Sequence, residues 1–131
     1  MIVIDTSALV GIYLPEIEAP ALRRVLAAAE ALLLPASCIV EFAMLHRLAG
    51  NRRRWLASLV ERLSIELVAI GPEVADVAAG AAERYGRGGG HQARLNFGDC
   101  LSYAVAKHLG APLLYKGDDF VHTDIESALP S

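Results

Sequence analysis

Short apolar runs alternate along the chain with longer segments whose apolar residues recur at helical spacing. A short apolar run between turn-forming residues is typical of a buried strand, whereas the helical repeat indicates a helix with one buried face. The pattern predicts strands at residues 2–4, 32–34, 65–70 and 113–115, and helices at 7–13, 16–30, 37–48, 55–63, 72–85 and 97–109. Residues 124–125 are candidates for a fifth strand.

This order of elements predicts an α/β fold. Strands that alternate with helices form a mainly parallel sheet covered on both faces. We therefore expect three α/β/α layers around a sheet of four to five short strands. The chain has 131 residues, which is the size of one domain, so residues 1–131 are expected to form a single unit. In parallel sheets, functional sites lie at the carboxyl ends of the strands.

Asp5 stands at such a strand end. It follows the apolar run Ile2 to Ile4 directly and precedes Thr6 and Ser7, two residues that favour a helix start. A carboxylate beside a buried strand is costly unless something pairs with it. Asp5 therefore either caps the following helix or belongs to a charged site.

Three further acidic positions follow the same rule. Glu41 is expected in the first turn or so of the helix after the second strand, and Asp99 in the first turn of the last helix. Asp118 and Asp119 come directly after the fourth strand. Taken singly, each is explained by a helix dipole that favours an acid near its start, or by a solvated turn. Taken together, they place four acidic positions at one edge of the sheet.

Carboxylates that converge repel one another unless a cation holds them. Hard divalent ions such as Mg²⁺ and Mn²⁺ prefer oxygen ligands, and Mg²⁺ commonly uses a few carboxylates together with water and substrate phosphate. Such a site suits metal-assisted hydrolysis of a phosphodiester bond, because the ion lowers the pKa of water and neutralises charge on the phosphate oxygens.

Four segments carry a resemblance to a known family. They read IVIDTSA at 2–8, VE at 40–41, LNFGDC at 95–100 and KGDDFVHTDI at 116–125. In order and spacing they resemble the PIN-domain family, and more narrowly the VapC-type ribonuclease toxins of bacterial toxin–antitoxin pairs. The resemblance runs from residue 1 to residue 125, and the NFGD and GDDF motifs are its most specific parts.

The resemblance implies a Mg²⁺-dependent endoribonuclease, with Mn²⁺ as the alternative ion, that a cognate VapB-type antitoxin inhibits. Asp5 and Asp99 match the principal metal ligands of the family, and Glu41 matches a third acid that binds metal or orients the attacking water. The fourth acid is Asp119 or Asp118, with Asp119 favoured. A homodimer is also implied. The RNA substrate, the cleavage motif and the number of metal ions stay open.

Thr6 or Ser7 is expected to hydrogen-bond Asp5 and hold it in position. Lys116 is a candidate for contact with phosphate, and Arg52–Arg54 either contact phosphate or form a solvated helix face. Trp55 is expected in the core or in a partner groove. Residues 86–90 form a glycine-rich, mobile connection near the site. Gly88, Gly89 and Gly90 occupy a region where the family pattern leads us to expect more basic residues, so RNA contact by this loop is in doubt.

Composition limits the class of protein and its expected location in the cell. The chain is 54% hydrophobic with a mean hydropathy of +0.39, and this favours a dimer or a bound partner. Its net charge of −3 argues against a protein that coats nucleic acid generally. With no apolar stretch of the roughly 20 residues that a membrane helix needs, and no leader pattern at Met1, we expect a cytoplasmic protein. Cys38 and Cys100 are expected to be buried apolar side chains, and the four histidines lack metal-ligand spacing.

Three other functions fit the sequence less well. A phosphatase with an aspartyl nucleophile needs a second acid two residues after the first, where this chain has Ser7. A receiver domain pairs two acids at the position where Asp5 stands alone. A non-catalytic PIN-fold module that only binds a partner is the main alternative. Loss of the acids would be its simplest signature, and all of them are present.

Overall fold

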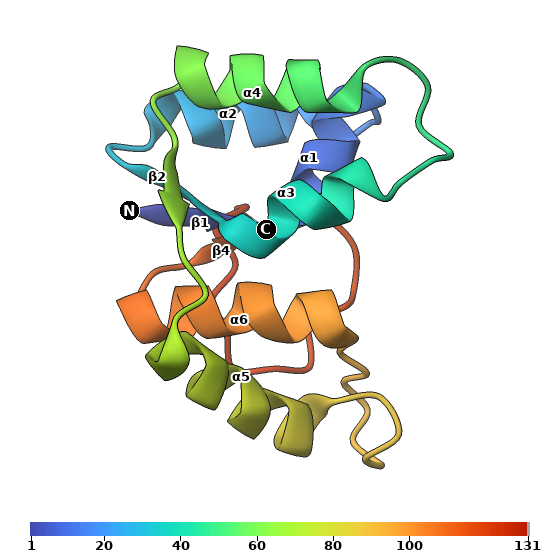
Figure 1. Ribbon diagram of the computed structural model, residues 1–131, viewed down its shortest axis with the longest axis vertical. Coiled ribbons are helices and arrows are strands. Elements are labelled where there is room, and N and C mark those ends of the chain that lie inside the picture. Colours follow the sequence, from blue (N-terminus) through green and yellow to red (C-terminus); the bar gives the residue numbers. More distant parts are fainter. Residues whose placement is uncertain (131) are drawn as a thin grey trace.

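The computed structural model describes residues 1–130 and contains four strands and six helices in this part of the chain (Figure 1). In chain order the elements are β1 (Ile2–Ile4), α1 (Thr6–Tyr13), α2 (Ala19–Ala28), β2 (Leu32–Pro35), α3 (Ala36–Ala43), α4 (Arg52–Arg62), β3 (Glu66–Val68), α5 (Pro72–Tyr85), α6 (Phe97–Leu109) and β4 (Leu113–Leu114).

The strands form one sheet in the order β3-β2-β1-β4, and every pairing is parallel. The predicted α/β fold with a parallel sheet is therefore confirmed. The predicted fifth strand at 124–125 is wrong. The segment after β4 returns to lie parallel to it. Only two hydrogen bonds, both at Leu113, join the two, so they make a single bridge between Leu113 and Ser127 and no strand.

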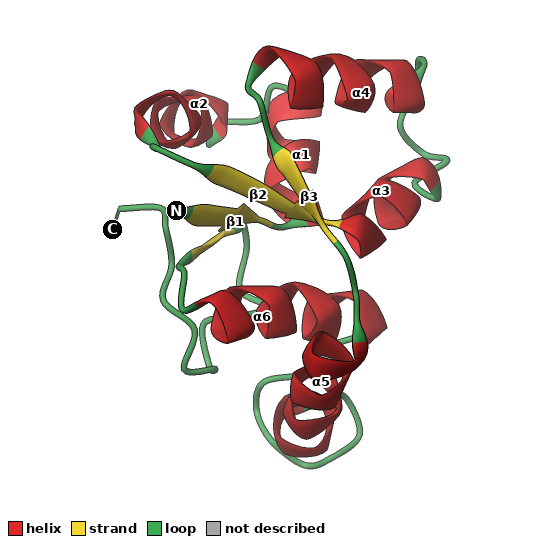
Figure 2. Cartoon of the chain, turned by 60° about the vertical axis from the view of Figure 1, so that its left-hand side comes forward, coloured by secondary structure: helices red, strands yellow, loops and turns green. Residues whose placement is uncertain are grey.

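Alternate residues of the strands fill two separate cores. Val3 and Leu113 project into a core with α5 and α6, whereas Ile4 and Leu114 project into a core with α1 to α4. Figure 2 shows the resulting layers, with α5 and α6 on one side of the sheet and the other four helices on the opposite side. Burial on both faces explains why these strands read as unbroken apolar runs.

Helix α3 is shorter than predicted, since it ends at Ala43 instead of residue 48. The guanidinium of Arg52 explains this end. Its Nη2 donates to the carbonyl of Ala43 at 3.1 Å and its Nη1 donates to the carbonyl of Leu48 at 2.6 Å. A helix leaves its last carbonyls without partners inside the helix, and Arg52 supplies one. Arg52 thus has two carbonyl partners within the chain, a structural role that the sequence did not predict.

The remaining boundaries follow local signals. Helices α5 and α6 match their predicted ranges, with Pro72 opening α5 and Gly110 closing α6 in the left-handed conformation at a φ of 64°. Helix α2 is shorter at both ends than the predicted 16–30. Across residues 1–130, none of the helices combines the length and apolar character required to cross a membrane.

Candidate active site

Asp5 lies between β1 and α1 and is 4% exposed. Its Oδ2 accepts hydrogen bonds from the backbone N–H of Ser7 at 3.0 Å and from Ser7 Oγ at 2.7 Å. Asp5 is therefore the N-cap of α1, as one of the two interpretations of the sequence held. Its charge also raises the pKa of Glu41 and of Asp99, so Asp5 is near two other acids.

Asp99 lies in the first turn of α6, as predicted, and is 7% exposed. It forms a reciprocal cap with Asn96. The Asp99 N–H donates to Asn96 Oδ1 at 2.8 Å, and the Asn96 N–H donates to Asp99 Oδ2 at 3.1 Å. Burial, and next to it the charges of Asp5, Asp119 and Glu41, raise the pKa of Asp99 to about 7 in spite of the hydrogen bond from the Asn96 backbone, which lowers it.

Glu41 lies early in the second turn of α3, which begins at Ala36, close to the place expected for it. Its carboxylate rests against the start of α6, where a Cβ at position 98 would overlap Oε2. Thr6 Oγ1 donates to Glu41 Oε1 at 2.8 Å. Burial raises the pKa of Glu41, against the hydrogen bond from Thr6, and the charge of Asp5 adds to the rise.

Either Thr6 or Ser7 was expected to hydrogen-bond Asp5, and in the structure the two hydroxyl groups bond different carboxylates. Ser7 holds Asp5 and Thr6 holds Glu41. Sequence reasoning missed Gly98 altogether. The sequence signal that could have found it is the glycine inside the NFGD motif. In the structure this glycine leaves room for the carboxylate of Glu41 at the start of α6.

Asp118 and Asp119 are both exposed in the turn after β4. Asp119 is among the charges that raise the pKa of Asp99, whereas Asp118 is not. Lys116, in the same segment, is already engaged. Its ammonium pairs with Glu16 at 2.8 Å and its N–H donates to Ser7 Oγ at 3.0 Å. The structure thus gives Lys116 a partner within the chain.

We call Asp5, Glu41, Asp99 and Asp119 the acidic edge. Asp5 and Asp119 follow β1 and β4, Glu41 lies in the second turn of α3 and Asp99 in the first turn of α6. The charges of the other three all raise the pKa of Asp99. Within residues 1–130, no three acidic, histidine or cysteine side chains stand close enough to form a complete metal cluster by themselves. Mg²⁺ needs only one or two carboxylates beside water and phosphate. The donors at the acidic edge are all carboxylate oxygens, and Gly98 leaves room for that of Glu41, so the residues fit such an ion.

Cys38 lies behind the acidic edge and is fully buried. Its Sγ contacts the carbonyl of Ile4 at 3.8 Å and Ser102 Oγ at 3.5 Å. Burial raises the pKa of the Cys38 thiol to about 12, with the charge of Asp5 as the next contribution. A thiol that stays protonated is a poor nucleophile and metal ligand. The prediction that Cys38 and Cys100 are buried is confirmed.

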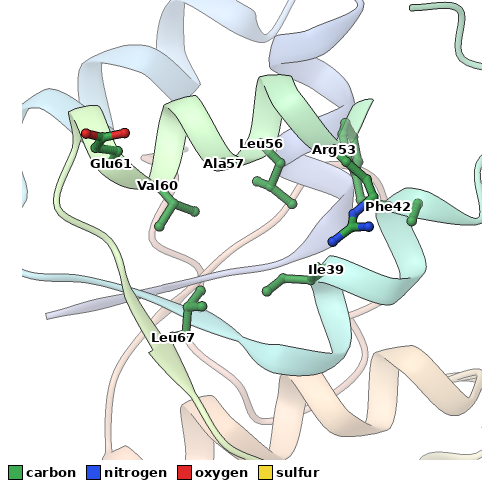
Figure 3. A pocket seen from close by; sticks show the side chains of 9 residues that line it. Ile39, Phe42, Arg53, Leu56, Ala57, Val60, Glu61 and Leu67 are labelled. Atoms are coloured by element: carbon green, nitrogen blue, oxygen red, sulfur yellow. The ribbon is translucent and has the colours of Figure 1, made fainter. Parts of the chain in front are cut away.

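A second feature is an apolar groove of about 300 Å³ between α3, α4 and β3, which we call the α3–α4 groove. Figure 3 shows Leu56 and Val60 of α4 facing it from one side, with Ile39 and Leu67 on the other. Arg53 and Glu61 stand nearer its two ends. Trp55 packs instead against Tyr13 and Phe42, with ring centroids 5.0 and 5.5 Å away. Of the two positions expected for it, it takes one at the edge of the core, partly buried.

Comparisons with known proteins agree with this geometry. A family model described as "PIN domain" matches residues 2–126. The chain is 42% identical over 130 residues to Ribonuclease VapC42 of Mycobacterium tuberculosis (strain ATCC 25618 / H37Rv), covering 96% of this chain and 98% of that protein.

Two solved structures share the fold. One is M. tuberculosis VapC20, described as a sarcin-ricin loop cleaving toxin, with a TM-score of 0.77 and 19% identity over 99% of this chain and 100% of the other. The second is a chain of a toxin–antitoxin complex from Klebsiella pneumoniae, with a TM-score of 0.65 and 13% identity over 92% of this chain and 90% of the other.

Proposed function

From the premise that the chain belongs to the PIN-domain family, we propose that it is a metal-dependent endoribonuclease that hydrolyses RNA phosphodiester bonds at the acidic edge. Residues 1–131 act as one nuclease domain and as the toxin of a type II toxin–antitoxin pair. The name of its relative at 42% identity, a VapC ribonuclease, supports the activity. The observation that carries the site is that two buried aspartates, Asp5 and Asp99, lie with the half-buried Glu41 and the exposed Asp119 near enough for the other three charges to raise the pKa of Asp99.

Asp5 and Asp99 are the principal ligands of the ion, which is Mg²⁺ or Mn²⁺, and Asp119 is the fourth acid, with Asp118 as the alternative. Bound there, the ion would lower the pKa of water and neutralise charge on the phosphate. The chain's own residues do the rest. Ser7 fixes Asp5, the cap with Asn96 fixes Asp99, and each leaves carboxylate oxygen available.

Glu41 orients the attacking water and accepts its proton, or serves as a third ligand. Its raised pKa suits the first role, because a base works best when its pKa approaches the working pH. The hydrogen bond from Thr6 points the carboxylate toward α6, where Asp99 stands. Thr6 is thus a positioning residue for Glu41.

The inhibiting partner is a VapB-type antitoxin, and its apolar helix occupies the α3–α4 groove. An apolar groove with one cation and one anion near its ends accepts an amphipathic helix with complementary charges. The toxin–antitoxin complex that shares the fold supports a partner of this kind.

The toxin forms a homodimer in the cytoplasm. Three exposed apolar side chains beside the acidic edge support self-association, namely Phe97 at 83%, Met44 at 68% and Val40 at 60% exposure. Val40 lies on α3, Met44 is the C-cap of that helix one turn later, and Phe97 opens α6 next to Gly98. Exposed patches of this kind mark interaction surfaces.

Cleavage of total RNA by purified, antitoxin-free protein tests the proposal. We expect fragments with Mg²⁺, none with EDTA, and none from Asp99→Asn. The exposed Asp76 of α5 provides the control, since Asp76→Asn removes the same charge away from the site and should cleave like the parent. If Asp99→Asn cleaves as well as the parent, the carboxylate mechanism is wrong. If the folded parent never cleaves RNA yet binds its partner, the non-catalytic binding module becomes the better account of the protein.

A further inference from the structure

Beside the acidic edge lies a polar groove, and most of its lining residues have no role in the proposed reaction. It is about 460 Å³ in volume and is lined on one side by Asp118 and Asp119. The other lining residues are Arg87, Gln92, Ala93, Arg94 and His122. We call it the arginine groove. Asp119 belongs both to this groove and to the acidic edge, so the two are continuous.

Arg87 and Arg94 are exposed, and neither guanidinium forms a salt bridge or a hydrogen bond with another side chain among residues 1–130. This holds although Asp118 and Asp119 line the same groove. The two cations therefore have charge and donors left for an external anion. Guanidinium groups match phosphate geometry with paired hydrogen bonds.

The segment that carries both arginines is closed at its base. The Arg87 N–H donates to the carbonyl of Leu95 at 3.0 Å, and the Leu95 N–H donates to the carbonyl of Tyr85 at 3.0 Å. His91 adds an inner support, since its Nδ1 accepts from the Ala93 N–H at 2.9 Å and its ring packs edge-on against Tyr85. The backbone on either side of the glycines thus fixes where the two arginines stand.

We propose that the arginine groove binds the RNA backbone next to the scissile bond, with Arg87 and Arg94 each contacting a phosphate. The inference rests on the proposed ribonuclease function and names the substrate contact of that site. It answers the doubt raised by residues 88–90, because the basic contacts flank the glycines and do not lie within them. A chain with a net charge of −3 repels RNA in general, so local cations at the site are needed to position it.

Binding in EDTA separates this contact from hydrolysis. The probe is a fluorescein-labelled single-stranded RNA of mixed sequence, followed by anisotropy over a series of NaCl concentrations. Each phosphate contact on a single strand contributes about 0.7 to the slope of log K against log salt. The Arg87→Gln/Arg94→Gln double variant should therefore bind about tenfold more weakly and lower the slope by about 1.4.

Arg23 and Arg24 supply the matched control, because both are exposed on α2 and their double Gln variant removes the same charge. It should bind RNA with the slope of the parent. In Mg²⁺, the groove variant should show a raised KM with kcat within about twofold of the parent, as expected when binding alone is lost.

If the groove variant binds RNA with the affinity and slope of the parent, the arginine contact is overturned and the proposed nuclease function is unaffected. A general charge effect, in which both double variants weaken equally, would overturn it as well. Failure of the parent to cleave in Mg²⁺ would instead refute the proposed function. These results come from different experiments, so the two failures can be told apart.

Discussion

Two aspartates, Asp99 and Asp124, differ in how the fold surrounds a carboxylate. Asp124, after β4, is exposed and accepts two hydrogen bonds. Lys107 Nζ donates to its Oδ2 at 2.8 Å and Tyr103 Oη donates to its Oδ1, and these bonds, that of Lys107 first, lower its pKa. Asp99 is buried among other acids, with no cation beside it in the described chain, and its pKa is raised to about 7.

The difference separates a carboxylate that stabilises the fold from one that we propose serves function. Asp124 ties the segment after β4 to α6, because both of its partners lie on that helix. Asp99 opposes folding whenever it is ionised, since charge is removed from water and set beside like charge. Strongly perturbed groups of this kind cluster at functional sites.

The largest effect is expected from Asp99→Asn. The amide removes a metal ligand, and cleavage should fall about a thousandfold, which corresponds to several kcal/mol of lost transition-state stabilisation. The same change should raise the Tm of the metal-free protein at pH 8, because the Asn oxygen keeps the cap while the repulsion is gone. Parallel cleavage and thermal unfolding assays check both effects. A lower Tm together with full activity would break the comparison.

Gly98→Ala tests whether Glu41 must lie against α6. The added Cβ overlaps Glu41 Oε2, so the carboxylate must move, and we expect kcat to fall about tenfold to a hundredfold. Gly80→Ala is the control, because nothing lies within 4 Å of the added Cβ in α5. That change should stabilise the protein by up to about 1 kcal/mol and leave cleavage unchanged. Equal kcat for both variants would show that Glu41 needs no fixed place.

The pH dependence of stability should separate the two aspartates by sign. Asp99 has a pKa of about 7 when folded and an ordinary value of 3.8, so the folded state holds its proton more tightly. Its contribution to the free energy of unfolding therefore falls as pH rises from about 4 to about 7. The contribution of Asp124 is present above pH 4 and is lost as pH falls through its lowered pKa.

Urea unfolding at several pH values, without metal, measures this contrast. The gain in stability of Asp99→Asn over the parent should grow from pH 4 to pH 7 and then level off. A gain that stays constant with pH would mean that Asp99 titrates normally in the folded protein.

Asp124→Asn is expected to give the smallest effect. The ion pair with Lys107 is exposed on both sides, so solvent screening limits its loss to about 0.5 kcal/mol, or a few degrees in Tm. Cleavage should match the parent. Loss of cleavage in a stably folded Asp124→Asn protein would place this acid in the site instead.

The sequence was sufficient for the order of elements and for the edge on which the acids stand. Strand ends follow from apolar runs, and the acids at 5, 99 and 118–119 come directly after strands or at a helix start. It was not sufficient for contacts between distant elements. Thr6 meets Glu41 across 35 positions, and Arg52 ends α3 by reaching two carbonyls of the preceding loop and helix. Such contacts depend on how helices pack, which no local pattern encodes.

Thermal unfolding of the parent and of Asp99→Asn at pH 8, with increasing Mg²⁺, tests most directly whether the acidic edge is a metal site. An ion that binds only the folded state stabilises it by about 2.7 kcal/mol at a hundred times its Kd. We predict that Mg²⁺ raises the Tm of the parent until it reaches or exceeds that of Asp99→Asn, whose own Tm barely moves. Equal Mg²⁺ shifts for the two proteins would contradict the account.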